Sequence, residues 1–413
     1  MEFIKFIIYV SIYIGLVSTT FFILSFFFGE KKKKLLYSDD ELPKVSVIIP
    51  AYNEEKSIEA TIKSILKTDY PKSKFQVIVV DDGSNDNTLK LAKKFEKFGV
   101  EVYTKKNGGK GTALNFGLKK VNGEIMFSMD ADTFVDKKCV KQMVRFFKNK
   151  SVMCVSPAIL VANPKNILQR VQYVEYILGL FLRKAFATVN AIHITPGAFS
   201  AYRKSFFDKY GGYDEGNITE DLELAMRIQF KGYIIEHSPE SPAYTIAPNK
   251  FSHLLKQRRR WYVGLLKNTV KYSKMFSPKY GDLGMFIMPI AWLSVFFAVF
   301  ITSYSLIKIF IEIRKEILFL NSINFDLYGI FNINYFFIER FLFLYFSNPV
   351  VIFILIFMLI MGGYLFYASK KIGKISSPFI NLPLFFLFFS VLFGFWWIVS
   401  LIYVLFNKEI KWK

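Results

Sequence analysis

Long apolar runs occupy the two ends of the chain, and its middle has none. Residues 6–28 carry no charge and are long enough to cross a hydrocarbon core of about 30 Å. Three later runs also predict spans: Gly284–Phe310, Phe341–Ala368 and Phe379–Phe406. We therefore expect an N-terminal membrane helix (1–30), a domain outside the membrane with an interfacial segment at its end (31–280), and a C-terminal membrane region of about three helices (281–413).

Short apolar runs alternate with amphipathic segments within residues 31–280. Four runs read as buried strands: Val45–Ile49, Phe75–Val80, Val100–Tyr103 and Ile125–Met129. Three segments between them predict helices: Glu54–Lys67, Asn87–Phe98 and Gly111–Lys119. Strands that alternate with helices across short loops predict an α/β domain with a Rossmann-like parallel sheet covered on both faces.

The charge of the chain is strongly positive, at +21, and residues 31–280 alone hold 43 Lys and Arg against 25 Asp and Glu. Such a surface binds nucleic acid in some proteins and faces anionic lipids in others. No helix-turn-helix, zinc-finger or RNA-binding signature is present, and apolar spans flank the domain, so we expect membrane lipids and no nucleic acid as partners. The two cysteines, Cys139 and Cys154, lack metal-site spacing and are expected to be free, buried thiols.

Lysines close to the spans predict how the chain crosses the membrane. The run Lys31–Lys34 follows the first span, which predicts a multi-pass protein of the cell membrane with its central domain in the cytoplasm. Three C-terminal spans would leave the last lysines outside, against the charge rule. Either the tail is an exception, or one apolar segment lies in the interface, or a further pass lies near Leu327–Phe337. A cleaved signal peptide is disfavoured because residues 6–28 are long and lack a small-residue cleavage site.

Polar and acidic side chains follow three of the predicted strands. They are Tyr52 and Glu54 after the first, Asp81 and Asp82 after the second, and Asp130 and Asp132 after the fourth. Ligands of such sheets bind at the carboxyl ends of the strands, although helix capping by Asn53 or Ser84 is the simpler explanation of any one loop. Two carboxylates two residues apart suit a divalent cation bound to a diphosphate. Lys110 lies in a glycine-rich turn before a helix, where it either approaches phosphate or is merely solvated.

Two more motifs lie further along the domain. Ile218–Asp221 opens a helix over Leu222–Phe230, and Gln257–Trp261 places three arginines and a tryptophan just ahead of the membrane. Helix capping and the helix dipole explain the first motif without catalysis. Lipid headgroups and an interfacial aromatic belt explain the second.

All these motifs in this order resemble the processive branch of the family-2 glycosyltransferases, which includes cellulose and poly-N-acetylglucosamine synthases. The resemblance covers roughly residues 44–275, and it rests most on Thr219–Asp221 and on the Gln-x-x-Arg-Trp pattern of Gln257–Trp261. It implies a GT-A fold, an inverting mechanism and a nucleotide-sugar donor, with UDP as the nucleotide.

The resemblance also assigns a role to each motif. Nucleotide binding falls to Tyr52, Glu54, Asp81, Asp82, Lys110 and Asp130. Asp130 and Asp132 would bind an Mg²⁺ or Mn²⁺ ion. Catalysis falls to Glu220 and Asp221, with Asp221 as the general base. Pyrophosphate and acceptor binding fall to Gln257, Arg258, Arg260 and Trp261, with Trp261 as a platform for the acceptor sugar.

Three functions are compatible with these motifs: two kinds of sugar transfer and one role without catalysis. The first is extension of a polysaccharide. The second is transfer of one sugar to a lipid such as a polyprenyl phosphate or a ceramide-like lipid, since some single-transfer relatives share the Arg-Trp motif. The third is a non-catalytic scaffold, which predicts damage to the acidic set, whereas Asp82, Asp130, Asp132 and Asp221 are all present. The expected partners are a nucleotide sugar and a glycan or lipid acceptor, and the sequence identifies no protein partner.

Overall fold

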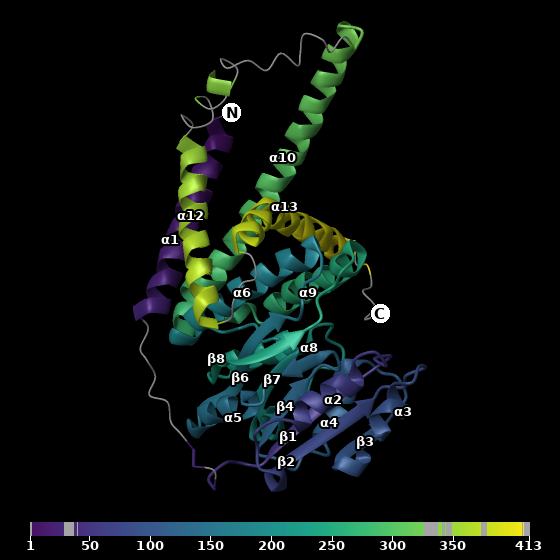
Figure 1. Cartoon of the computed structure of the whole chain (residues 1–413). Coiled ribbons are helices and arrows are strands. Elements are labelled where there is room, and N and C mark those ends of the chain that lie inside the picture. The colour runs from purple at the N-terminus through teal and green to yellow at the C-terminus, as the bar shows by residue number, and fades with distance from the viewer. Residues whose placement is uncertain are drawn as a thin grey trace.

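A computed structural model describes residues 2–28, 37–38, 40–325, 338–340, 343, 349–372, 378–406 and 408 (Figure 1). Several sequence features used for topology lie outside the described residues. These are Lys31–Lys34, the segment Leu327–Phe337, and Lys374, Lys411 and Lys413. The expectations that rest on them remain predictions.

The centre of the protein is one eight-stranded mixed sheet in the order β3-β2-β1-β4-β7-β6-β8-β5. The strands are β1 Val45–Ala51, β2 Phe75–Asp81, β3 Val100–Thr104, β4 Ile125–Met129, β5 Thr133–Val135, β6 Val152–Val161, β7 Phe199–Arg203 and β8 Ile234–Thr245. The first four are parallel, as predicted, and β7 then pairs antiparallel with β4 and β6. The sequence prediction did not include β5 to β8, and the predicted wholly parallel sheet is in fact mixed.

Burial on both faces explains the continuous apolar strands. Along β1, Val47 and Ile49 belong to one core cluster, and Ile48 between them belongs to the other. Helix α4 (Lys110–Leu118) packs so closely on this strand that a Cβ at Gly117 would lie 2.6 Å from Ile48 Cγ2. These two cores hold the strand ends in place for the loops that follow them.

The first two predicted helices are shorter than expected. Helix α2 spans Ile58–Leu66, and α3 spans Thr88–Lys93, with a separate 3₁₀ turn at Glu96–Phe98. The residues ahead of α2 instead bind the neighbouring loop, since the Glu54 N–H donates to Thr88 Oγ1 at 2.7 Å and the Glu55 N–H to Asp86 Oδ2 at 3.2 Å. The side chains of Asn53 and Ser84 likewise join the two loops and cap neither helix.

Two long helices separate the sheet from the apolar helices. They are α6 (Ile167–Thr188), which the side chain of Asn166 caps, and α9 (Phe251–Lys271). The remaining helices of the domain are α5 (Cys139–Val144), α7 (Lys204–Tyr210) and α8 (Glu220–Phe230). Cys139 and Cys154 are free and buried, as expected.

In the part of the chain that the structure describes, four apolar helices lie beyond α6 and α9: α1 Glu2–Phe28, α10 Met288–Ser322, α12 Pro349–Ile372 and α13 Pro378–Leu405. By length and composition, three segments of the described chain are able to cross a membrane, namely Phe3–Phe27, Leu283–Ser322 and Asn381–Leu405. Helix α12 contains a shorter apolar stretch, Val351–Gly363.

Helix α13 has a different direction from the other apolar helices. Figure 1 shows it running across α6 and α9, whereas α1 and α12 run away from the sheet domain. The Trp397 ring of α13 stacks on Tyr262 of α9, with centroids 4.5 Å apart. Where α13 crosses α10, a Cβ at Gly394 would overlap the side chain of Thr302, so glycine permits the close crossing. Helices α6 and α9 are thus enclosed between the sheet and the apolar helices.

Candidate active site

A cavity of about 1450 Å³ lies between the strand ends and the helices α6, α8 and α9. Twelve residues predicted from the sequence line it: Tyr52, Glu54, Asp82, Lys110, Asp130, Asp132, Glu220, Asp221, Gln257, Arg258, Arg260 and Trp261. Asp81 is the predicted site residue outside this lining. The cavity exceeds the 300–1,000 Å³ typical of sites for one small ligand, so it has room for two substrates.

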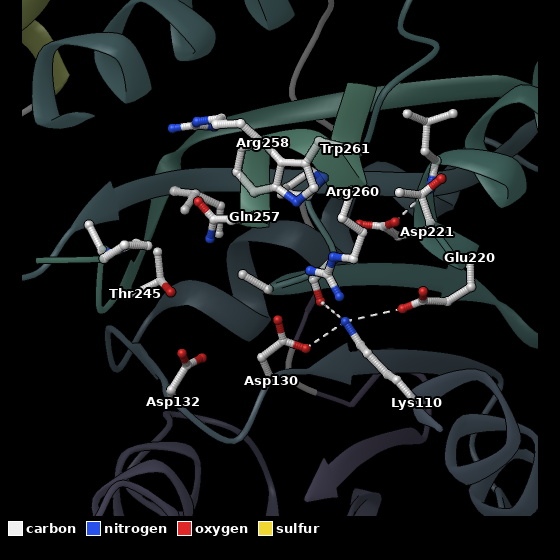
Figure 2. A pocket seen from close by; sticks show the side chains of 18 of the residues that line it. Lys110, Asp130, Asp132, Glu220, Asp221, Thr245, Gln257, Arg258, Arg260 and Trp261 are labelled. Atoms are coloured by element: carbon white, nitrogen blue, oxygen red, sulfur yellow. Dashed lines mark hydrogen bonds and ion pairs between the residues drawn. The ribbon is translucent and has the colours of Figure 1, made fainter. Parts of the chain in front are cut away.

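Lys110 is at the centre of the acidic side of the cavity (Figure 2). Its ammonium lies 2.6 Å from Asp130 Oδ1 and 3.2 Å from Glu220 Oε1, and it donates to the Gly197 carbonyl oxygen at 3.3 Å. Burial opposes a charge here, but the carboxylates of Asp130 and Glu220 outweigh it and raise the pKa of Lys110. Lys110 therefore joins the carboxylate of Asp130, at a strand end, to that of Glu220, at the start of α8, a link that the glycine-rich turn alone did not indicate.

Asp221 occupies the first turn of α8, facing the same cavity. Its Oδ1 accepts a hydrogen bond from the Leu222 N–H at 2.8 Å. Burial and the neighbouring Glu220 raise the pKa of Asp221 to about 6. A Cβ at Gly197 would overlap Asp221 Oδ2 and lie 3.1 Å from Lys110 Nζ, so only glycine lets these two side chains share the space. An unprotonated Asp221 with this pKa can act as a general base near neutral pH.

Thr219 begins α8 but does not cap it with its hydroxyl. The buried Thr219 Oγ1 accepts instead from Asn268 Nδ2 of α9 at 3.1 Å. A Cβ at Gly264 would overlap this threonine, which shows how closely α8 and α9 approach each other. The motif at Ile218–Asp221 therefore joins α8 to α9, the helix that carries Gln257–Trp261, which simple helix capping does not explain.

The two aspartate pairs of the strand ends have different surroundings. Burial, followed by the carboxylates of Asp130 and Glu54, raises the pKa of Asp132 to about 7, as expected for crowded carboxylates with too little positive charge nearby. Asp82 instead accepts from the Gly109 N–H at 2.7 Å and pairs with Lys105 at 2.6 Å. Asp81 is buried and accepts from Thr104 Oγ1 at 3.0 Å.

Asp81 and Asp82 thus hold the loops around the cavity. The predicted contact of these two side chains with the nucleoside remains a prediction.

The arginines of α9 point in different directions. Arg258 Nη2 lies 2.7 Å from Glu175 Oε2 of α6, and Arg259 Nη1 donates to the Tyr403 hydroxyl of α13 at 2.7 Å. Figure 2 shows the Arg260 side chain extending towards Lys110 and Asp130, whereas Arg258 points away from them. Arg260 also contributes a positive charge that lowers the pKa of Asp221 against the effect of burial. Of these arginines, Arg260 has the geometry expected for diphosphate binding.

Sequence reasoning missed Glu175, which lines the cavity and pairs with Arg258. One signal was available, because Glu175 is the only acidic residue between Asp136 and Asp208. A single carboxylate in a long basic and apolar stretch needs a reason to be there.

The mixed sheet with a cavity at its acidic strand ends is the arrangement of a GT-A fold. Residues 46–211 match the family model described as Glycosyl transferase family 2, so this part of the chain has the sequence pattern of that family. The family resemblance seen in the motifs is thereby confirmed.

Comparison with known proteins agrees with this assignment. The chain is 30% identical over 230 residues to the poly-beta-1,6-N-acetyl-D-glucosamine synthase of Staphylococcus aureus (strain COL), covering 54% of this chain and 55% of that protein. The synthase of Staphylococcus epidermidis is 30% identical over 247 residues, covering 56% and 58%. The chain thus matches just over half the length of these relatives.

A solved structure shares the fold over nearly the whole chain. It is a mannosyltransferase from Pyrobaculum calidifontis in complex with GDP-Man and Mn²⁺, with a TM-score of 0.60, 18% identity, and coverage of 98% of this chain and 100% of that one. The predicted GT-A fold with apolar helices is confirmed.

Proposed function

We propose that this protein is a membrane-bound, inverting glycosyltransferase that adds sugars from a nucleotide-sugar donor to a growing polysaccharide. The observation that carries the proposal is the position of Asp221. Its carboxylate shares one cavity with the acidic strand end at Asp130 and with Arg260 and Trp261 of α9. A base, a diphosphate side and an aromatic platform around one cavity are what direct sugar transfer needs.

The donor would occupy the strand-end side of the cavity. Tyr52 and Glu54 lie where a nucleoside would bind, and UDP is the nucleotide that the family resemblance implies. Asp130 and Asp132 would hold an Mg²⁺ or Mn²⁺ ion. Among the described residues no three His, Cys, Asp or Glu side chains cluster closely enough to hold an ion, so diphosphate oxygens and water would supply the other ligands. When bound, the ion would stabilise negative charge on the leaving diphosphate.

The reaction would be one direct displacement at the anomeric carbon. Asp221 would take the proton of the acceptor hydroxyl while the acceptor oxygen bonds to the anomeric carbon. The bond from the carbon to the diphosphate oxygen breaks, and its electron pair leaves with the nucleoside diphosphate. Arg260 is placed to stabilise the departing charge, and Lys110 holds Asp130 and Glu220 in position throughout.

The direction of α13 favours one of the three topologies left open by the sequence. If α13 lies in the membrane interface, the chain crosses into the cytoplasm at α1, out of it at α10 and back into it at α12. The lysines after α12 and those at the C-terminus then all lie in the cytoplasm, as the positive-inside rule requires. We propose this arrangement, with the catalytic domain of residues 31–280 on the cytoplasmic side of the cell membrane.

Product size tests the proposed function most directly. The purified full-length protein in lipid nanodiscs, with Mn²⁺ or Mg²⁺, would be incubated with a panel of radiolabelled nucleotide sugars. A ladder of oligosaccharides that lengthens with time is the expected result. A single labelled lipid product would instead establish single transfer to a lipid, and release of free sugar alone would exclude both.

A further inference from the structure

Arg258 is a buried cation, 2% exposed, with two partners on opposite sides of the α6–α9 contact. One is Glu175 of α6, at 2.7 Å, and the other is Trp261, whose ring centroid lies 4.3 Å from the guanidinium carbon. Glu175 and Trp261 both line the cavity. The guanidinium therefore joins a carboxylate on one helix to an aromatic ring on the other.

Burial makes the two charges depend on each other. A buried guanidinium is tolerated when a carboxylate and hydrogen bonds compensate for the water it has lost. Glu175 is the carboxylate within ion-pair distance of Arg258 in the described part of the chain. Burial raises the pKa of Glu175, and Arg258 opposes that rise. Loss of either charge would leave the other unpaired beside the cavity.

The neighbouring polar residues of α6 have a different task. Gln169 Nε2 donates to the Ala247 carbonyl at 2.9 Å, and Gln172 Nε2 donates to the Pro248 carbonyl at 2.9 Å. These bonds hold the backbone that leads into α9. Glu175, in contrast, reaches a side chain within Gln257–Trp261 itself, so it acts on the orientation of that motif.

We propose that Glu175 is a positioning residue for the acceptor, which acts through Arg258 to hold the Trp261 ring in the orientation that binds the acceptor sugar. The inference rests on the proposed function, in which Trp261 is the acceptor platform. The guanidinium occupies one face of the indole, and the acceptor sugar stacks on the other. A flat cation on a ring face is held by the ring quadrupole as well as by packing, so the carboxylate that orients the cation also orients the ring.

The test compares Glu175→Gln with the unchanged full-length protein in nanodiscs. Initial rates are measured against donor and, separately, against a short oligosaccharide purified from the protein's own product. Hydrolysis of the donor by water, without acceptor, reports the donor side alone. We expect the KM for the acceptor to rise by up to about tenfold, because a misoriented Trp261 ring loses stacking contact with the sugar. The KM for the donor and the hydrolysis rate should stay within about twofold.

Further variants separate positioning from folding. Arg258→Lys keeps a positive charge but not the flat stacking surface, so it should raise the acceptor KM as well. Glu175→Asp keeps the carboxylate and should recover most of the loss. If Glu175 acts through Arg258, the double variant Glu175→Gln/Arg258→Gln should be no worse than Arg258→Gln alone. Asp208→Asn, which removes one side of the exposed Lys204–Asp208 pair, is the matched control and should change nothing.

Two outcomes would overturn the inference. One is an equal loss of donor hydrolysis and acceptor affinity in Glu175→Gln, and the other is full additivity in the double variant. Failure of the proposed function has a different signature, since Trp261→Ala would then leave the acceptor KM unchanged whatever Glu175→Gln does.

Discussion

The two walls of the cavity are built on different principles. On the sheet wall, Asp130, Glu220 and the Gly197 carbonyl all converge on the Lys110 ammonium. On the helical wall, Arg258 and Arg259 diverge, the first to Glu175 of α6 and the second to Tyr403 of α13. The charges of the sheet wall are therefore balanced by one another, whereas the α9 arginines of the helical wall are bound by side chains of α6 and α13.

Under the proposed function, this difference separates the groups that carry out the chemistry from those that position the acceptor. The sheet wall rests on a rigid two-sided core, which suits groups that must meet the reacting atoms accurately. The helical wall is fastened to apolar helices through Tyr403 and through the stacking of Tyr262 on Trp397. Changes in the sheet wall should therefore alter the chemical step or donor binding. Changes at Glu175, Arg258 or Trp261 should alter acceptor binding, whereas Arg260 of the same helix α9 extends towards the sheet wall and should act on the donor.

Asp221→Asn should have the largest effect, because an amide of the same shape cannot take a proton. We expect transfer to fall by about 10³-fold, within the range for loss of a general base. Binding of the nucleotide, measured by titration with the Mn²⁺ complex, should remain. Transfer at more than a tenth of the normal rate would remove Asp221 as the base and undermine the assignment of chemistry to the sheet wall.

Asp132→Ala should weaken donor binding without affecting acceptor binding. Loss of one carboxylate at the proposed ion should weaken Mn²⁺-dependent nucleotide binding by about 10- to 100-fold. The measurement is calorimetric titration of the nucleoside diphosphate with and without Mn²⁺, with Asp208→Asn as the control. Equal affinities for variant and normal protein in the presence of the metal would contradict the metal assignment.

Trp261→Ala tests the helical wall in the same assay. Loss of the stacking surface should raise the acceptor KM by about tenfold, since each stacked ring contributes roughly 1–3 kcal/mol in comparable contacts. Donor hydrolysis without acceptor should change little. A loss confined to donor binding would show that donor and acceptor binding are not divided between the two walls.

The pH dependence should show the smallest effect near neutrality. Because Asp221 is active unprotonated and burial with Glu220 raises its pKa to about 6, activity should fall as pH decreases through this value. Between pH 7 and pH 6 the expected loss in kcat/KM is about twofold, and it approaches tenfold per unit at lower pH. The profile would be recorded at saturating metal. Activity that stays constant down to pH 5 would contradict the raised pKa.

Local patterns predicted much of this structure. The strands β1, β2 and β4 were found because burial on both faces makes their sequences continuously apolar. Strand β8 was missed although it is long, because it mixes exposed and buried positions. Strand β6 was missed too, although all of its residues are buried. Helix α2 was predicted too long because Glu54 and Glu55, which precede it, donate their N–H groups to Thr88 and Asp86. Apolar periodicity does not reveal such bonds.

The site was predicted by residue type more accurately than by partner. Twelve of its predicted residues meet in one cavity, since strand ends of one sheet share an edge. The ion-pair partners of Lys110 and Arg258 could not be predicted, because Glu220 and Glu175 come from distant segments of the chain.

The sequence by itself determined the apolar helices, the first half of the sheet and the residue types of the site, because burial and periodicity act between near neighbours in the chain. Only the tertiary structure decided which carboxylates surround Lys110, that Glu175 faces Arg258, and that α13 crosses α6 and α9. These are contacts between remote segments, and their geometry depends on how whole elements pack. The residue types that line the cavity therefore come from short motifs, whereas the orientation of its helical wall depends on packing among α6, α9 and α13.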